Sequence, residues 1–421
     1  MWALVDANSF FASVEKVFHP GLQGKPVCVL SSNDGNIVAL TREAKALGIR
    51  RGAPYFEVKD IIERNHVAVF SGNIMLYAAM SKRVQSIMRR SVARSEAYSI
   101  DEQFLYLDGY EKYYDLEEYM REMVQRIKLW TDIPVSVGIA RTKTLAKVAS
   151  KFAKNYSGYR SVCMIDSEEK RRKALSLFEL KDVWGIGRHT LEKLNALGIT
   201  GTLQFADMPG EWVRKHLTKP GVQTWMELNG HPCIDTAEII RRQSVTTSRS
   251  FGEMISDKEQ LKAAVASFAG SCANTLRGQL SSAASVTVFA TSNRFRDDLE
   301  QYSGIRTMKL PIASSDTVEI TAAAMKLVDS IYRPGIMYKK AGVILGDIEC
   351  GAVQQDLFDP VPQRAERVEL SRAMDMLNHR YGVKTIRLAV EGGKDEKWRV
   401  KSDHRTPNYL TDIDELMTIN I

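Results

Sequence analysis

The stretch EAYSIDEQFLYLDG, residues 96–109, decides how the first part of this chain folds. It places two adjacent acids, Asp101 and Glu102, inside a run that is otherwise apolar and aromatic. Such a run predicts a largely buried strand, and a buried carboxylate is costly unless it is paired or binds a metal. Because successive strand residues face opposite ways, both acids can serve one site only if the chain bends there, as at the end of a hairpin. The alternative is a strand edge with two solvated acids.

A further acid stands in the apolar run that opens the chain. Asp6 lies in ALVDANSFF, residues 3–11, and the start of this run predicts a strand. If both strands belong to one sheet, Asp6, Asp101 and Glu102 supply three carboxylates to it. Hard divalent cations prefer oxygen ligands, and Mg²⁺ in particular combines a few carboxylates with substrate phosphates. Two such ions, about 3.5–4 Å apart, can catalyse an in-line displacement at phosphorus.

The composition indicates the class of protein. The 421 residues suffice for several domains, and no apolar run approaches the roughly 20 residues that cross a bilayer. The N-terminal MWALVDANSFF lacks a basic segment and soon reaches an acid, so we expect no signal peptide. Five scattered cysteines without a CxxC spacing indicate reduced thiols in a cytoplasmic protein and no zinc site. A net charge of +7 is compatible with a polyanionic partner.

Changes in pattern along the chain predict several domains. The first part alternates strand and helix patterns, which predicts a mixed α/β sheet covered by helices. The predicted divisions are residues 1–30 with 73–165 (mixed sheet), 31–72 (a small insert), 166–235 (helix-rich), 241–350 (a separate α+β unit) and 351–421 (a tail with one helix).

A basic helix is predicted next to the acidic region. RTKTLAKVASKFAKNYSG, which begins at Arg141, has its apolar residues on one face. The opposite face carries Lys143, Lys147, Lys151 and Lys154. Lysine faces of this kind are commonly solvated, but beside an acidic site they can hold phosphates.

VWGIGRHT, residues 183–190, resembles the turn of a helix-hairpin-helix. Gly185 and Gly187 have no Cβ, which would let backbone N–H groups approach a nucleic-acid phosphate. The helix that follows, from Arg188, would favour the negative charge at its N-terminus. An ordinary glycine-rich turn is the alternative.

Four stretches together resemble the Y-family of translesion DNA polymerases: VDANSFFASVE, YSIDEQF, SVGIARTKTLAKVASKFAK and VWGIG, in that order and spacing. The insert SSNDGNIVALTREAKALGIRRGAPYF, the SRSFGE at 248–253 and the C-terminal extension are most similar to the UmuC branch of that family. The resemblance implies a multidomain, right-hand polymerase of α/β and α+β domains. Its parts would be a palm (1–30 and 73–165), small fingers (31–72), a helical thumb with the helix-hairpin-helix (166–235), a little finger (241–350) and a C-terminal tail (351–421).

The resemblance also implies the catalytic centre. Asp6, Asp101 and Glu102 become the catalytic ligands of two Mg²⁺ ions, and the backbone carbonyl of Ala7 completes one site. In this family the two adjacent acids lie at the end of a hairpin, where both can serve one site.

Nucleotide contacts follow from the same resemblance. Phe11 takes the position of an aromatic steric gate, which blocks the 2′-OH of a ribonucleotide, and Phe10 packs near the incoming sugar. The implied triphosphate contacts are Arg42, Lys45 and Lys154.

Three positions depart from the wider family pattern. Asn8 stands where many members carry an acid, although UmuC-type chains also have Asn there. Arg42 stands where many members have Tyr. Gln103 follows the acid pair where a small residue is usual, which would narrow or re-tune the site.

The tail and the branch suggest further partners. QQDLF, from Gln354 to Phe358, resembles the pentapeptide that binds the bacterial sliding clamp. Leu357 and Phe358 would fill an apolar pocket and Gln354 would bond at its rim, whereas a chance match in a loop is the alternative. The resemblance implies primer–template DNA and a deoxynucleoside triphosphate (dNTP) as ligands. It also implies a processed UmuD dimer and a RecA filament as partners.

The expected activity is low-fidelity translesion synthesis in the SOS response to DNA damage. A primer 3′-OH would attack the α-phosphate of a dNTP. A two-metal nuclease is one alternative, but it would need neither the triphosphate contacts nor the aromatic gate. A DNA-binding scaffold without activity is another, and the three intact acids argue against it.

Overall fold

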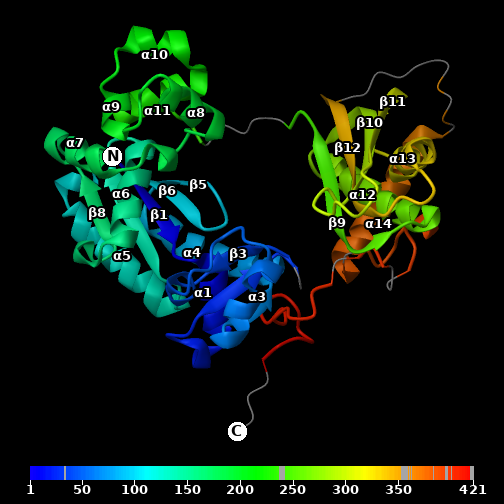
Figure 1. Cartoon of the computed structure of the whole chain (residues 1–421), viewed down its shortest axis with the longest axis horizontal. Helices are drawn as coiled ribbons and strands as arrows, with labels where there is room; N and C mark the ends of the chain where they lie inside the picture. The colour runs from blue at the N-terminus through cyan, green and yellow to red at the C-terminus, as the bar shows by residue number, and fades with distance from the viewer. Residues whose placement is uncertain are drawn as a thin grey trace. The chain divides into compact units, whose positions relative to one another are not determined.

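Figure 1 shows the computed structural model of the chain, which describes residues 1–32, 35–236, 242–351, 359, 361, 363–382, 384–393, 397–399 and 401–417. The chain forms two compact units, one of Met1–Ile239 with Ser402–Ile421 and the other of Ile240–Lys401. None of the helices in the described ranges combines the length and the apolar character that crossing a bilayer requires.

A five-stranded sheet lies at the centre of the first unit, with the strand order β5-β6-β1-β7-β8. Its strands are β1 (Trp2–Ala7), β5 (Arg94–Ala97), β6 (Glu102–Tyr106), β7 (Val135–Ala140) and β8 (Val162–Ile165). The strand β1 is antiparallel to β6 and β7, and β8 runs parallel to β7. Side chains of β1 alternate between two cores, since Ala3 and Val5 join one apolar cluster and Trp2 and Leu4 join another.

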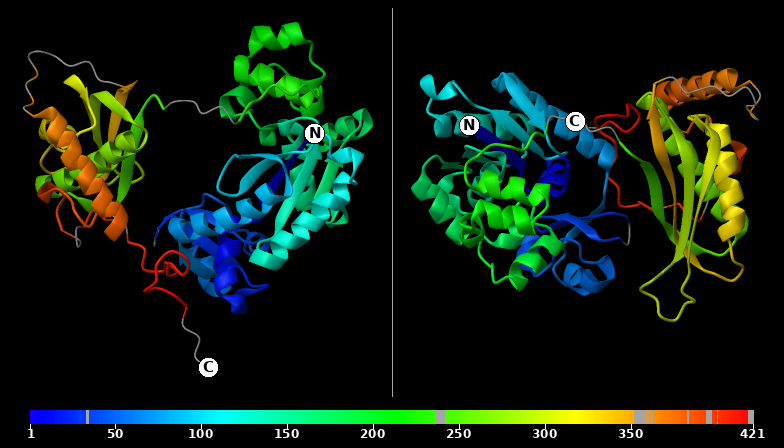
Figure 2. Two further views of the ribbon diagram at one scale, coloured as in Figure 1. Left: turned by 180° about the vertical axis from the view of Figure 1, so that it is seen from behind. Right: turned by 90° about the horizontal axis from the view of Figure 1, so that it is seen from above.

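Helices cover both faces of this sheet (Figures 1 and 2). Three of them contribute to the cluster that contains Val5: α1 (Phe10–Phe18), α4 (Ile74–Ser91) and α5 (Leu116–Thr131). The helix α6 (Lys143–Asn155) packs on the other face, against β7. Gly138 permits this close approach, because a Cβ there would lie only 2.0 Å from the backbone nitrogen of Ser150.

A separate three-stranded sheet has the order β3-β2-β4. Its strands are β2 (Val27–Leu30), β3 (Ile37–Leu40) and β4 (Ala68–Ser71), and its helices are α2 (Arg42–Ala46) and α3 (Tyr55–Arg64). Cys28 and Leu30 share a buried cluster with side chains of β3, α2 and α3. Backbone pairing thus joins β2 to the insert, across the division expected between residues 1–30 and 31–72.

The helix-rich part of the first unit follows β8. Its helices are α7 (Glu168–Leu177), α8 (Arg188–Ala196), α9 (Thr202–Ala206), α10 (Gly210–His216) and α11 (Lys219–Leu228). Short 3₁₀ turns elsewhere in the chain are Pro20–Leu22, Tyr110–Lys112, Ser157–Tyr159, Leu180–Asp182 and Ala389–Glu391. Residues 180–228 bury their apolar side chains in the same cluster as α6.

The second unit is an antiparallel sheet of order β11-β10-β12-β9. Its strands are β9 (Val245–Ile255), β10 (Ser281–Ser292), β11 (Ser303–Ser314) and β12 (Tyr338–Cys350). Its helices are α12 (Lys258–Gly278), α13 (Thr317–Ile331) and α14 (Arg364–Tyr381). The alternating burial along β10 places one face of the sheet against α12 and α13, as the sequence pattern predicts.

The C-terminal tail is divided between the two units. Trp398 is buried in the core of the second unit and stacks edge-on against Phe268, with ring centroids 5.7 Å apart. Residues 402–417 instead pack with the first unit. The single tail expected for 351–421 is therefore two segments with different tertiary contacts.

Candidate active site

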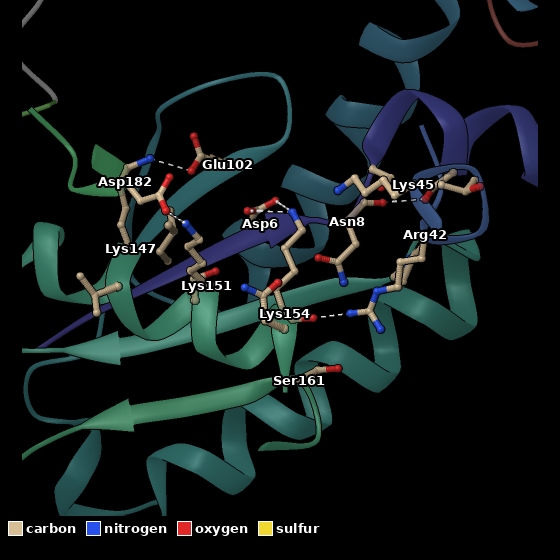
Figure 3. Close-up of a pocket in the computed structure, with 18 of the residues that line it drawn as sticks. Asp6, Asn8, Arg42, Lys45, Glu102, Lys147, Lys151, Lys154, Ser161 and Asp182 are labelled. Atoms are coloured by element: carbon tan, nitrogen blue, oxygen red, sulfur yellow. Dashed lines mark hydrogen bonds and ion pairs between the residues drawn. The ribbon is translucent and has the colours of Figure 1, made fainter. Parts of the chain in front are cut away.

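Asp6 and Glu102 lie directly opposite each other on neighbouring strands. They are paired in the antiparallel register of β1 and β6. Their side chains share the alternation of Leu4 and Phe104, which pack in the α6 cluster. The two carboxylates therefore lie on the face of the sheet that α6 covers, where Figure 3 shows them.

Asp101 belongs to the turn that joins β5 to β6. The N–H groups of Tyr98 and Ser99 both donate to the carbonyl of Glu102 at 3.1 Å, which closes the hairpin. The Ser99 hydroxyl donates to Oδ1 of Asp101 at 2.6 Å and accepts from the N–H of Glu102 at 3.1 Å. The N–H of Ala7 donates to the carbonyl of Asp101 at 2.9 Å and ties the turn to β1. The predicted hairpin is confirmed.

A cavity of about 790 Å³ opens beside these strands. Of the residues expected at the site, it is lined by Asp6, Arg42, Lys45, Glu102 and Lys154. Asp101, although the structure describes it, is not among the residues that line this cavity. The structure thus brings two of the three acids to one cavity, together with the three expected cations.

Lys154 is the ionic partner of Asp6. Its Nζ lies 3.1 Å and 3.2 Å from the two carboxylate oxygens. Burial raises the pKa of Asp6 above its ordinary value, and the nearby carboxylates of Glu102 and Asp101 act in the same direction. The Lys154 ammonium opposes this shift, so a positive charge at this position favours the ionised form of Asp6.

Lys147 is the ionic partner of Glu102. Its Nζ donates to Oε1 at 2.6 Å and lies 4.5 Å from the ring centroid of Tyr98 and 5.3 Å from that of Trp184. The Trp184 indole N–H also donates to the Tyr98 hydroxyl at 3.0 Å. Sequence reasoning did not assign Lys147 to Glu102. The available signal was that Lys147 and Lys154 lie two helical turns apart on one helix face.

The lysine side of α6 is not a solvated face. Lys143 is buried, with a side chain only 3% exposed, and pairs with the buried Glu96. Farther along the helix, Lys151 pairs with Asp182 at 2.5 Å. The solvated alternative therefore fails for Lys143 and Lys147, which turn toward acids of neighbouring elements, whereas the side chain of Lys151 is 41% exposed.

Arg42, Lys45 and Lys154 converge on one side of the cavity (Figure 3). Arg42 donates from its guanidinium to the backbone carbonyl of Lys154. Burial lowers the pKa of Lys45, and the positive charges of Lys154, Arg42 and Arg51 lower it further. Three cations held this close together form a site that favours an anion.

Phe10 and Phe11 begin α1 but differ in their surroundings. Phe10 is buried in the core, 3% exposed. Phe11 is partly buried and stacks on Tyr77, with ring centroids 4.4 Å apart and planes inclined by 20°. Neither ring is among the residues that line the cavity, so their contacts with a nucleotide remain predictions.

The glycine turn before α8 has a packing reason as well. Gly185 has φ +92°, and a Cβ there would lie 2.1 Å from the Thr224 hydroxyl oxygen. Gly187 has open space around it and is followed by the exposed Arg188, whose side chain pairs with Glu192 at 2.7 Å. The position of Gly187 is thus compatible with a phosphate contact, whereas Gly185 is required by the fold. Gln354, Leu357 and Phe358 lie outside the described residues.

The donor set at the cavity suits a hard cation. Carboxylate oxygens are the preferred ligands of Mg²⁺, and Asp6 and Glu102 each already face a positive charge. Within the described ranges, no three His, Cys, Asp or Glu side chains are grouped closely enough to hold a metal ion. That Asp6, Asp101 and Glu102 share one metal site therefore stays a prediction.

Comparisons with known proteins identify the family. Models of the impB/mucB/samB family match residues 5–151, and models of its C-terminal domain match 242–357. A third model, described as a domain of unknown function, matches 369–419. Protein UmuC of Salmonella typhimurium is 39% identical over 422 residues, which cover 100% of each chain. DNA polymerase IV 1 of Bacillus subtilis is 27% identical over 401 residues, 93% of each chain. The chain belongs to the Y-family DNA polymerases, in the UmuC branch.

The solved structures agree on the architecture of this Y-family polymerase. A Y-family DNA polymerase chimera superimposes with a TM-score of 0.64 at 22% identity, over 83% of this chain and 99% of the other. At 22% identity the likeness shows the fold alone. That fold is the right-hand polymerase expected from the sequence.

Membership of the family establishes the activity. The chain is a DNA-directed DNA polymerase for translesion synthesis in DNA damage tolerance and SOS mutagenesis. Y-family polymerases use divalent metal ions. The polymerase is thereby favoured over the nuclease and the inactive scaffold.

Proposed function

We propose that this polymerase adds a dNTP to a primer 3′-OH on a DNA template, with Asp6, Asp101 and Glu102 as ligands of two Mg²⁺ ions. The observation that carries the proposal is the opposition of Asp6 and Glu102 across β1 and β6, at the wall of the cavity. Asp101 precedes Glu102 in a turn that is hydrogen-bonded to Ala7. The carbonyl of Ala7 would complete one ion's ligands.

When bound, the ions would lower the pKa of the primer 3′-OH and neutralise the phosphates of the departing pyrophosphate. The protein's own contribution is to hold the carboxylates ionised and in place. Lys154 now pairs with Asp6, and it would be released toward a triphosphate oxygen once another cation balances that carboxylate. Arg42 and Lys45, on the same side of the cavity as Lys154, would donate to the same triphosphate.

Sugar selection is proposed to depend on Phe11. Its ring would lie against C2′ of the incoming sugar and exclude a 2′-OH by overlap, with Phe10 packed beneath. The stacking of Phe11 on Tyr77 supports this role, because the contact favours one position of the Phe11 ring.

The folded parts of this polymerase suggest a division into the domains of a right hand. We propose that the five-stranded sheet is the palm, the β3-β2-β4 sheet with α2 and α3 the fingers, and α7 to α11 the thumb. The sheet of the second unit would be the little finger. Primer–template DNA would contact the thumb at Gly187 and Arg188, with Gly185 shaping that turn.

Partners beyond DNA are proposed from the sequence. QQDLF would attach the polymerase to the sliding clamp through Leu357, Phe358 and Gln354. A processed UmuD dimer and a RecA filament are the further partners expected of a UmuC-type subunit. We place the activity in the cytoplasm, where all five cysteines would remain unpaired, as they are in the structure.

Primer extension tests the proposal. Asp101→Asn should abolish nucleotide addition with Mg²⁺ while the Kd for primer–template DNA stays within about twofold, because the proposed DNA contacts lie elsewhere. Asp132→Asn is a matched control, since this partly exposed acid has φ +54°, a conformation that Asn accepts readily. Full activity of Asp101→Asn would overturn the metal assignment. Primer shortening by the parent chain would indicate a nuclease instead.

A further inference from the structure

A segment near the C-terminus packs against the part of the first unit that carries Phe11. It comprises residues 402–417, which belong to the same compact unit as α1. The carbonyl of His404 accepts from the N–H of Ser71 at 3.0 Å, and Arg405 forms a parallel bridge with Ser71. The segment therefore adds to the end of β4, within the region matched by the domain of unknown function.

Thr406 joins α1 to α4. Its hydroxyl donates to Oε2 of Glu15 in α1. Its backbone carbonyl accepts from Nδ2 of Asn73 at 2.6 Å, and Asn73 is the N-cap of α4. Thr406, Glu15 and Asn73 are 3%, 0% and 1% exposed, so water does not replace these contacts.

The same carboxylate reaches the proposed gate. Oε1 of Glu15 accepts from the hydroxyl of Tyr77, which is fully buried. The ring of Tyr77 is the one on which Phe11 stacks. A continuous series of contacts thus runs from Thr406 through Glu15 and Tyr77 to Phe11.

The spacing of residues along α1 places the side chains of this series on one face of the helix. Phe11, Glu15 and Phe18 are four and then three residues apart, which places them on one helix face. At the far end of that face, Phe18 contacts Tyr409 of the segment, with ring centroids 5.2 Å apart. The segment therefore contacts Glu15 and Phe18 on the helix face that also carries Phe11.

Glu15 depends on these hydroxyl donors. Burial raises its pKa above the ordinary value, while the hydrogen bonds from Thr406 and Tyr77 act in the opposite direction. The ring of His19 is also near, with Nδ1 4.0 Å from Oε2. If the Thr406 hydroxyl is removed, Oε2 loses its donor in a buried place, and the carboxylate must shift toward another partner. Tyr77 shares that carboxylate and would move with it.

We propose that Thr406 is a positioning residue for sugar selection, which holds the Phe11 ring in its excluding position through Glu15 and Tyr77. This inference rests on the proposed function, since it requires Phe11 to be the steric gate. It gives the C-terminal segment a role in the choice between deoxyribonucleotides and ribonucleotides, although the segment itself touches no nucleotide.

The test measures kcat/KM for one dNTP and for the matching ribonucleotide, with the full chain on an undamaged primer–template. Thr406→Val removes the hydroxyl and keeps the shape and the carbonyl contact with Asn73. We expect it to raise the ratio of ribonucleotide to deoxyribonucleotide incorporation by roughly threefold to tenfold, the range of one hydrogen bond. Thr406→Ser should restore the parent ratio. Thr411→Val, at an exposed position of the same segment, should leave it unchanged.

Epistasis with Phe11 separates positioning from a general loosening of the site. In a Phe11→Ala background, where the gate is already gone, Thr406→Val should not change the ratio further. An added effect there would overturn the proposal, as would an unchanged ratio in Thr406→Val alone. Tyr77→Phe keeps the stacked ring and removes the hydrogen bond to Glu15, so it should also raise the ratio. It provides a second test if Thr406→Val folds poorly. If Phe11→Ala itself leaves the ratio unaltered, the gate assignment fails, and this inference fails with it.

Discussion

The Nζ atom of Lys147 lies 2.6 Å from Oε1 of Glu102, and both side chains are mostly buried, at 16% and 21% exposed. The ammonium also lies over the ring of Tyr98. The mostly buried carboxylate of Glu102 is thus paired with a positive charge from α6. A divalent cation at the same carboxylate would have to compete with the lysine, which makes the pair a sensitive reporter of metal binding.

Lys147→Ala should make stability depend on Mg²⁺. Loss of the lysine leaves the Glu102 carboxylate without its partner, and we expect the free energy of unfolding to fall by about 1–3 kcal/mol. Because Mg²⁺ would replace the missing charge, it should raise the melting temperature of this variant more than that of the parent. Lys151→Ala, which breaks the pair with Asp182, is the control. Equal Mg²⁺ shifts in all three proteins would contradict a metal at Glu102.

Lys154→Ala should weaken nucleotide binding. The lysine pairs with Asp6 and lies close to the cations Arg42 and Lys45, so its loss should raise the KM for a dNTP by roughly tenfold. The Kd for primer–template DNA should change much less. Lys128→Ala, an exposed lysine of α5, serves as the matched control in steady-state kinetics. A change confined to DNA affinity, with the usual dependence on salt, would give Lys154 a general electrostatic role instead.

Glu15→Gln should alter the pH dependence of stability. Burial raises the pKa of Glu15 in the folded chain above its ordinary value of 4.5. The folded state therefore binds this proton more tightly than the unfolded chain. The resulting stability is fully present below pH 4.5 and is lost as the pH rises through the raised pKa. Glutamine cannot ionise, so the variant should gain in free energy of unfolding relative to the parent across that window. Urea titrations at several pH values measure the difference, and a pH-independent difference would contradict the assignment.

Replacement of Leu357 and Phe358 by Ala should abolish stimulation by a loaded sliding clamp. A ring that encircles the duplex gives a polymerase a second attachment, which raises its effective concentration at the primer end. Basal primer extension should stay unchanged, because neither residue belongs to the proposed catalytic centre. Normal stimulation of the double variant would show that QQDLF is an accidental match, or that another surface carries the contact.

Local patterns predicted much of the fold. The apolar run that opens the chain became β1, and the helix predicted from Arg141 became α6. These elements follow from side-chain periodicity, which acts over a few residues. The sequence did not predict the sheet to which β2 belongs. Pairing of β2 with β4 depends on a backbone partner about forty residues away, and periodicity carries no information on partners.

The candidate site shows the same limit. The sequence by itself determined which acids and lysines are present and which family the motifs resemble, and through that resemblance it predicted that Asp101 and Glu102 stand at the end of a hairpin. Only the tertiary structure decided that Asp6 pairs with Glu102 rather than with a neighbouring residue of β6, that Lys147 faces Glu102, and that Lys143 is buried against Glu96. It also decided that Thr406 bonds to Glu15, 391 residues earlier in the chain. The physical reason is that strand register and the burial of a charge depend on elements distant in sequence, whereas helix and strand periodicity are written into each segment.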